Sequence, residues 1–415
     1  MTPVAPAADR VVVVGASMGG LRAAEAVIKA GYAGEVVVIG AEPHLPYNRP
    51  PLSKDALHAE PDLAGLQFRV PRAAKDVRWR LDVSVTSADL VARTVTLDDG
   101  DVLGWRGLIA AAGLRPRQVS VPGPSGGRHV LRTVEDALAL RASMTPGRRL
   151  VVIGAGFVGC EVAATARRLD LEVDVVAPGA VPMDRPLRGE LGAALQRRHE
   201  ARGVRFHLGA VPVEYLGTAA EPDRVGAVRL SDDTVLDADV VVEAVGSSPN
   251  VEWLAGNGLD LGDGLLCDPQ LRVEGRPDLV ACGDIARFPN LRYDDVPRRV
   301  EHWTMVTDTA RRAGHTLRAY LAEAVLDTTP FRPVPSFWSD QYDLRIQSFG
   351  AIGLGPDDVR VLEGDLDGEL AVGYHRDGEL MGVAMVGLAG RHAYYRDLVT
   401  GAGDDAPAGA SNVAN

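Results

Sequence analysis

Two glycine-rich stretches are the parts of this sequence best suited to chemistry, because both could hold phosphates. The first is Gly15-x-Ser17-x-x-Gly20, which follows an apolar run at residues 11–14 and precedes a helical pattern. Such a turn lets the backbone approach a pyrophosphate, and the helix dipole favours the negative charge. Glu42, after the next strand, could accept hydrogen bonds from an adenosine ribose. A tight turn in any α/β fold could show the same residues.

The second stretch is a complete GxGxxG, with the sequence GAGFVG at residues 154–159 between a strand pattern and a helix pattern. Two such units in one chain are a stronger signal than either alone, since one can hold a flavin and the other a nicotinamide. Ala177 stands where an acidic residue would accept the ribose 2′-hydroxyl, and Arg185 could attract a 2′-phosphate. The choice between NADH and NADPH is therefore open.

Three charged side chains follow these turns in places where they could meet a ligand. Residues 43–54 contain four prolines, which stiffen the backbone around Arg49 and Lys54. Fixed cations suit an anion or an electron-rich ring, although a rigid surface loop with solvated cations fits equally well. Asp284 follows a glycine at a strand end, where it could bond a ligand hydroxyl or cap a helix.

The elements that must position these side chains alternate along the chain, which predicts an α/β fold. The expected strands lie at 11–14, 35–39, 108–113, 150–153, 173–176 and 238–246, and the expected helices at 21–29, 160–169, 306–326 and 391–399. Short strands are expected over 70–101, and alternating strand segments lie between 336 and 386.

Composition excludes several classes of protein. The chain has 415 residues and a net charge of -12, which suggests two or three domains and argues against a nucleic-acid partner. No apolar run is long enough for a membrane span and no secretory signal is visible, so no membrane role is expected. Three widely spaced cysteines favour a cytoplasmic location. The nine histidines are scattered, which gives metal binding no support.

Several motifs together resemble the pyridine-nucleotide-disulfide-oxidoreductase-like flavoproteins, specifically the ferredoxin reductase branch. The resemblance extends from about residue 11 to residue 399. Its most specific pieces are PYNRPPLSK at 46–54, CGD at 282–284, EHW at 301–303 and FWSDQY at 337–342.

The resemblance implies two Rossmann-like dinucleotide-binding domains, arranged as in glutathione reductase, plus a C-terminal α+β domain. The implied cofactors are FAD and NADH or NADPH. The corresponding boundaries are 1–118 and 247–326 for the FAD-binding domain, 119–246 for the NAD(P)-binding domain, and 327–415 for the C-terminal domain.

The resemblance also assigns roles to single residues. Lys54 is implied near the reactive N5 edge of the flavin, and Glu161 near the nicotinamide, paired with Lys54 as the catalytic residues. The other residues implied for FAD are Gly15, Ser17, Gly20, Glu42, Arg49, Val85 in the adenine pocket, Asp284, Glu301, Trp303 and Trp338. Those implied for the nicotinamide nucleotide are Gly156, Val158 and Gly159, with Arg185 and Gly246 nearby.

The sequence departs from the family pattern at Ser17, Ala112 and Ala177, and no cysteine precedes Cys160. Without a thiol beside the flavin, disulfide reduction is excluded, and we expect NAD(P)H to reduce a ferredoxin that serves an oxygenase. Cys160 is expected to be a small buried residue. The chain is expected to be a monomer or a homodimer. Two alternatives remain open: a redox-sensing flavoprotein resembling apoptosis-inducing factor, and a direct reductase of a small organic acceptor.

A ferredoxin is acidic, and so is this chain, so docking requires a local basic patch. The candidate residues for that patch are Arg298, Arg299, Arg311, Arg312 and Arg345, each of which could equally be an ordinary solvated arginine.

Overall fold

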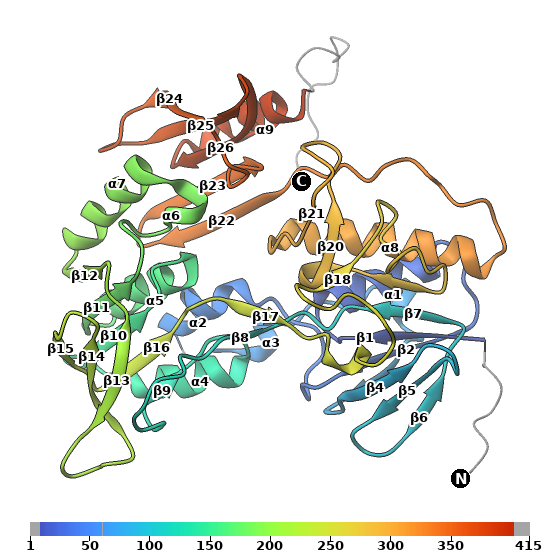
Figure 1. The fold of residues 1–415 in the computed structure, drawn as a ribbon, viewed down its shortest axis with the longest axis horizontal. Helices are drawn as coiled ribbons and strands as arrows, with labels where there is room; N and C mark the ends of the chain where they lie inside the picture. The colour runs from blue at the N-terminus through green and yellow to red at the C-terminus, as the bar shows by residue number, and fades with distance from the viewer. Residues whose placement is uncertain (1–8, 60, 402–415) are drawn as a thin grey trace.

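A parallel sheet formed by the N-terminal unit positions the first glycine turn (Figure 1). The structure is a computed structural model that describes residues 9–59 and 61–401. Its strand order is β19 (Leu279–Ala281), β7 (Gly107–Ala110), β1 (Arg10–Val14), β2 (Glu35–Gly40) and β3 (Arg78–Leu81). The valines of β1 are buried on both faces, as in a central parallel strand. Because β2 and β7 flank β1, a topological switch point lies at its carboxyl end.

Two long helices cover this sheet and pack against each other. They are α1 (Met18–Lys29) and α8 (Trp303–Leu321), and a Cβ placed on Gly314 of α8 would lie 2.6 Å from the Cβ of Ala26. A small antiparallel sheet completes the unit, formed by β4 (Val85–Asp89), β5 (Thr94–Leu97) and β6 (Val102–Gly104). Short elements follow the first turn: a 3-10 turn (Pro50–Ser53), α2 (Asp55–His58), α3 (Leu63–Leu66) and a 3-10 turn (Arg72–Ala74).

The prediction of a helix over 306–326 was wrong at both ends. Helix α8 begins at Trp303, three residues earlier, and it ends at Leu321. Glu323 adopts a left-handed conformation with φ of 54°, and the Ala324 N–H bonds to the Ala319 carbonyl. This is the hydrogen-bonding pattern of a Schellman motif, which terminates the helix even without a glycine.

The second glycine turn lies on a sheet of the same kind. Its order is β12 (Val204–Leu208), β11 (Glu172–Ala177), β10 (Arg149–Ile153), β16 (Val240–Glu243) and β9 (Arg128–His129), all parallel. Its helices are α4 (Val134–Ser143), α5 (Phe157–Arg168), α6 (Asp184–Leu187) and α7 (Gly189–Glu200). An antiparallel sheet packs beside it, formed by β13 (Pro212–Gly217), β14 (Val225–Leu230) and β15 (Val235–Asp237). The recurrence confirms the two predicted dinucleotide-binding units.

The two units are joined by a pair of antiparallel strands. β8 (Leu114–Pro116) leaves the first unit, and β17 (Ser247–Pro249) returns to it. The returning chain then forms the 3-10 turn Glu252–Leu254, β18 (Leu265–Leu266), the 3-10 turn Gly283–Ile285, β20 (Ala286–Pro289) and β21 (Pro297–Arg298).

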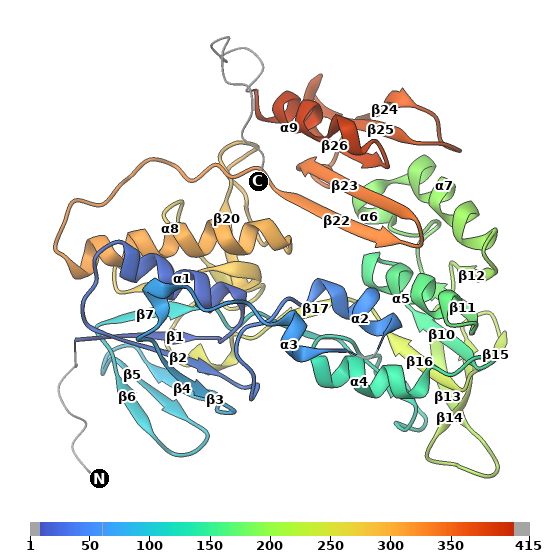
Figure 2. The ribbon, with the colours of Figure 1, turned by 180° about the vertical axis from the view of Figure 1, so that it is seen from behind.

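A C-terminal antiparallel sheet lies against α6 and α7 (Figures 1 and 2). Its order is β22 (Ser336–Gln341), β23 (Leu344–Gly350), β26 (Glu379–Val386), β25 (Leu370–Arg376) and β24 (Asp358–Gly364). One face packs on the second unit through an apolar cluster that includes Phe337, Ile346 and Leu191. The other face is covered by α9 (His392–Thr400), which the 3-10 turn Ala389–Arg391 precedes.

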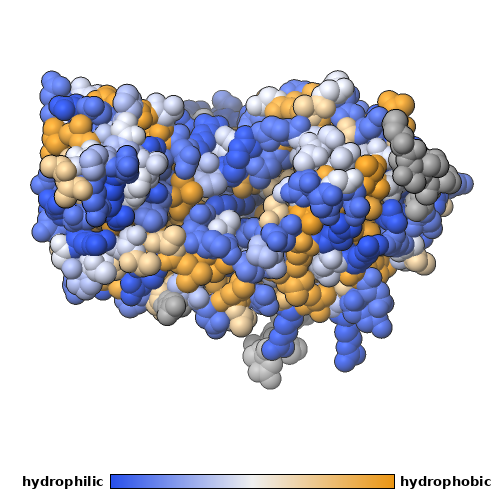
Figure 3. All heavy atoms as spheres, turned by 90° about the horizontal axis from the view of Figure 1, so that it is seen from below, coloured by the Kyte–Doolittle hydropathy of each residue, from blue (hydrophilic) through white to orange (hydrophobic). Residues whose placement is uncertain are grey.

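Hydrophilic side chains cover most of the face seen in Figure 3, and apolar residues lie between them in smaller groups. Within the described ranges, every helix is too short or too polar to cross a membrane.

Candidate active site

The two glycine turns open onto one cavity of about 1750 Å³ between the units. The carboxyl ends of the central strands of both parallel sheets face it, as do residues 301–303 and Trp338. A site for one drug-sized ligand measures about 300–1,000 Å³. The larger volume therefore suits two ligands bound side by side.

The first glycine turn is shaped by close packing of backbone. Gly15 has φ of 118°, and a Cβ there would lie 2.1 Å from the Ala111 carbonyl oxygen. A Cβ on Gly20 would lie 1.9 Å from the Gly15 oxygen, so Gly20 serves helix packing and does not line the cavity. Ser17 does line it, and its side chain makes no capping bond to α1. The first N–H groups of α1 are thus available to an anion.

The second turn repeats this arrangement. A Cβ on Gly154 would lie 2.3 Å from the Ala244 oxygen, and one on Gly159 would lie 2.0 Å from the Gly154 oxygen. Gly156 differs, because nothing lies within 4 Å of its Cβ position. Gly156 and the half-exposed Val158 both line the cavity, which leaves room for a pyrophosphate against the backbone.

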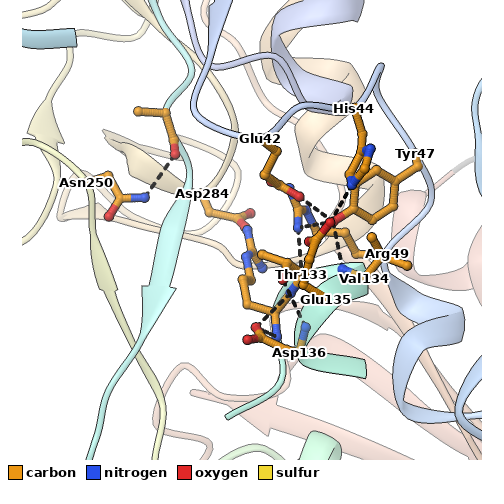
Figure 4. Close-up of polar contacts among 12 residues, drawn as sticks. Glu42, His44, Tyr47, Arg49, Thr133, Val134, Glu135, Asp136, Asn250 and Asp284 are labelled. Atoms are coloured by element: carbon orange, nitrogen blue, oxygen red, sulfur yellow. Dashed lines mark hydrogen bonds and ion pairs between the residues drawn. The ribbon is translucent and has the colours of Figure 1, made fainter. Parts of the chain in front are cut away.

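Glu42, Tyr47 and Arg49 point toward one another at the edge of the cavity (Figure 4). The Tyr47 hydroxyl donates to Glu42 at 2.5 Å, and Arg49 forms an ion pair with the same carboxylate. Arg49 also donates to the Arg132 carbonyl at 2.8 Å. Its Nε is buried and has no partner among the described atoms. Arg49 therefore holds Glu42, the residue expected to bind the ribose, and its Nε–H could still donate to a bound cofactor.

Asp284 lies in the short turn that follows β19 and faces the cavity. It caps no helix, so the alternative of a helix cap was wrong; Cys282 occupies the position before this 3-10 turn. Burial raises the pKa of Asp284 to about 6, although Arg132, 3.9 Å away, opposes the shift. A half-buried carboxyl with so few partners is suited to bonding a ligand hydroxyl.

Lys54 and Glu161 form an ion pair, as the family resemblance implied. The Lys54 Nζ lies 2.7 Å from Glu161 Oε2, and it also donates to the Pro50 carbonyl at 3.0 Å. The proline-rich 3-10 turn at Pro50–Ser53 holds the lysine, and the first turns of α5 hold the glutamate. Two hydroxyls that sequence reasoning missed complete the carboxylate's contacts: Ser53 donates at 2.5 Å and Ser339 at 2.6 Å. Both serines lie within the motifs PYNRPPLSK and FWSDQY, which was the available signal.

Aromatic side chains form one wall of the cavity. The rings of Trp303 and Trp338 lie edge to face with centroids 5.5 Å apart, and the Trp303 indole N–H donates to Asn48. Glu301 also lines the cavity, and its side chain accepts hydrogen bonds from Arg299 and Ser247. These planar surfaces suit a flat ring system.

The remaining predicted residues divide into two groups. Arg185 and Gly246 line the cavity. Val85 does not line it, because β4 packs this side chain against the core of the first unit. Cys160 is fully buried, as predicted, and burial raises the pKa of its thiol to about 12.

Each of the five arginines of the candidate basic patch lies beside a carboxylate, which reduces the net positive charge that they offer to a partner. Arg299 and Arg312 are largely buried in such pairs, so they are not surface cations. The carboxylates that the others face are Asp294 for Arg298, Asp308 for Arg311 and Asp340 for Arg345.

The family model described as pyridine nucleotide-disulphide oxidoreductase matches residues 9–314. The chain belongs to that family. A second model, described as reductase C-terminal, matches residues 336–414. The chain is thus an oxidoreductase that uses FAD and NAD(P)H, and the cavity fits them: Gly156 is open, Gly15 admits no side chain, and the Arg49 Nε is free within the described region.

Relatives extend over nearly the whole chain. The anthranilate 1,2-dioxygenase system ferredoxin–NAD(+) reductase component of Burkholderia cepacia is 37% identical over 388 residues, covering 92% of this chain and 91% of that protein. Rhodocoxin reductase of Rhodococcus erythropolis is 33% identical over 393 residues, covering 94% and 89%. The structure of putidaredoxin reductase in covalent complex with putidaredoxin matches with a TM-score of 0.86 and 29% identity, covering 95% and 93%.

Proposed function

We propose that this protein is an NAD(P)H:ferredoxin reductase that supplies electrons to an iron–sulfur protein serving an oxygenase. The observation that carries the proposal is the Lys54–Glu161 pair, which lies in the one cavity onto which both glycine turns open. The matching relatives are named as ferredoxin reductases of oxygenase systems, which supports the same partner. The buried, protonated Cys160 does not suit disulfide exchange.

In this proposal, one set of cavity residues binds FAD and another set binds the nicotinamide nucleotide. Residues 1–118 and 247–326 bind FAD, and residues 119–246 bind the nicotinamide nucleotide. The ligands for FAD are Gly15, Ser17, Glu42, Arg49, Lys54, Asp284, Glu301, Trp303 and Trp338, with Gly20 shaping the turn. Those for the nicotinamide nucleotide are Gly156, Val158, Glu161, Arg185 and Gly246, with Gly159 shaping the turn.

Bound FAD supplies the chemistry, which is acceptance of a hydride and release of single electrons. The protein's part is to orient the two rings and keep water from them. The Trp303–Trp338 wall excludes water, and the two glycine turns fix the distance between the pyrophosphates. Lys54 offers an ammonium N–H at the meeting point of the rings, and Glu161 holds that lysine in place.

The test begins with the absorption spectrum of the purified protein, which we expect to show bound flavin. Anaerobic titration with NADH and with NADPH, separately, should bleach that flavin. Adding candidate ferredoxins should then allow rapid reduction of cytochrome c. Fast bleaching without ferredoxin-dependent turnover would indicate a direct reductase of an organic acceptor. Slow bleaching with a long-lived charge-transfer band would indicate the redox-sensing alternative, and a colourless protein would refute the proposal.

A further inference from the structure

The Glu161 carboxylate is the end of a buried chain of hydrogen bonds that enters the C-terminal sheet. Ser339 donates to its Oε1 at 2.6 Å, and the Gln341 amide contacts the Ser339 hydroxyl at 3.0 Å. The other atom of that amide, Oε1, lies 2.8 Å from His199 Nε2. Tyr342 then lies 3.3 Å from His199 Nδ1. The side chains of the first four are buried, in a region otherwise filled by the apolar cluster between this sheet and α7.

The strand pattern explains how these groups meet. Buried and half-buried residues alternate along β22, so Ser339 and Gln341 share the face that packs on the second unit. His199 lies in the last turn of α7, and Glu161 lies in the first turns of α5. Neither Ser339 nor Gln341 lines the cavity, so any effect of these two residues on bound nucleotides is indirect, and Ser339 contacts the cavity-lining Glu161 carboxylate directly.

The direction of every hydrogen bond in the chain follows from the carboxylate. An ionised carboxylate only accepts, so Ser339 must donate to it and accept from its next neighbour. Gln341 therefore presents its NH₂ group to Ser339, and the thioether of Met183, 3.6 Å from the same nitrogen, agrees with that orientation. The amide oxygen then faces His199, which must carry its proton on Nε2.

The state of His199 agrees with this assignment. Burial, together with Arg202 nearby, lowers the pKa of His199, while its bond to Gln341 opposes the shift. A neutral imidazole protonated on Nε2 leaves Nδ1 to accept from the Tyr342 hydroxyl. Every donor thus points toward the carboxylate, and aligned bonds of this kind polarise one another. An amide does not pass protons along, so the chain orients and stabilises charge and does not carry protons.

We infer that His199, Gln341 and Ser339 form a one-way chain that positions the active-site carboxylate for its pairing with the lysine. Through Ser339, the C-terminal sheet then helps to hold Glu161, the residue assigned to the nicotinamide side of the site. Its effect on hydride transfer rests on the proposed function, but the direction of the chain does not.

The direction is tested by imidazole ¹⁵N NMR of the full-length protein at pH 7, with and without flavin. We expect the His199 signals to report a neutral ring protonated on Nε2. An Nδ1-protonated ring or an imidazolium would overturn the inference. This measurement does not depend on enzyme activity. The only variant that it requires is one that lacks His199, which is used to assign the signals.

The consequence is tested by comparing His199→Gln, which keeps a donor toward Gln341, with His199→Phe, which keeps bulk but loses the donor. Anaerobic bleaching by NADH, without ferredoxin, gives the limiting rate and the apparent nucleotide affinity. We expect His199→Phe to lower the limiting rate about tenfold, with affinity changed less than about twofold, and His199→Gln to stay within about twofold of wild type. Equal rates for the two variants would refute the inference. Failure of the wild-type protein to bleach would instead refute the proposed function.

Discussion

The buried Lys54–Glu161 pair should couple strongly, whereas an exposed pair of the same chemistry should not. The two side chains are 13% and 5% exposed, and their charged atoms lie 2.7 Å apart. At an effective dielectric constant of about 20, the Coulomb attraction at this separation is roughly 6 kcal/mol. Desolvation offsets much of it, so we expect a net coupling energy of about 2–3 kcal/mol.

The assay is a double-mutant cycle of Lys54→Met and Glu161→Gln. Unfolding of the flavin-free protein in urea, followed by tryptophan fluorescence, gives the change in unfolding free energy. Each single variant leaves a buried charge or its donors unpaired and should lose about 3 kcal/mol. The double variant should lose about the same amount, not the sum.

The matched control is the Lys29–Glu25 pair of α1, which has the same 2.7 Å separation but a lysine that is 62% exposed. Its cycle should give a coupling of about 0.5 kcal/mol or less. A Lys54–Glu161 coupling as small as that of the control would show that burial does not strengthen this pair.

Three further predictions concern the cavity. Ala177→Glu should raise the preference for NADH over NADPH, measured as a ratio of kcat/KM, by about tenfold, because it adds an acceptor for the 2′-hydroxyl and repels a phosphate that Arg185 could attract; an unchanged ratio would contradict the assignment. Gly15→Ala should abolish flavin retention, because the new Cβ would lie 2.1 Å from the Ala111 oxygen at a φ of 118°, and the flavin-to-protein absorbance ratio checks it. Because the pKa of Asp284 is raised to about 6, folding favours its neutral form: this stability is fully present below about pH 4, and it is lost as the pH rises through 6. In the flavin-free protein, Asp284→Asn should therefore flatten the fall in Tm between about pH 4 and about pH 6.5, and an unaltered slope over that range would contradict this prediction.

The two strand–turn–helix units could be predicted from the sequence because short-range patterns determine them. The strands before both glycine turns lie where apolar runs placed them, and a helix follows each turn as expected, although it begins three residues earlier, at Met18 and at Phe157. The end of α8 could not be predicted, because Glu323 adopts a left-handed conformation that its residue type does not signal.

The candidate site was predictable only in part, because its residues come from distant parts of the sequence. The meeting of Lys54 with Glu161 came from family resemblance, since more than a hundred residues separate them in the sequence. The contacts of Ser339, Gln341 and His199 depend on how the C-terminal sheet docks on α7, which no short-range pattern encodes. Val85 packs against the core of the first unit, an orientation that resemblance did not reveal because it carries over a residue type and not a side-chain direction.

The paired strands β8 and β17 have a consequence for how such a chain can be altered. Leu114 faces Pro249 and Pro116 faces Ser247, so the chain leaves and re-enters the first unit through neighbouring points. The first unit is therefore built from two stretches of chain that meet at this strand pair. The segment between β8 and β17 begins and ends at neighbouring points of the structure. A segment from another reductase, selective for a different pyridine nucleotide, would have to match those two junctions, the surface presented to the C-terminal sheet and the contacts made with Arg49, Ser53 and Lys54.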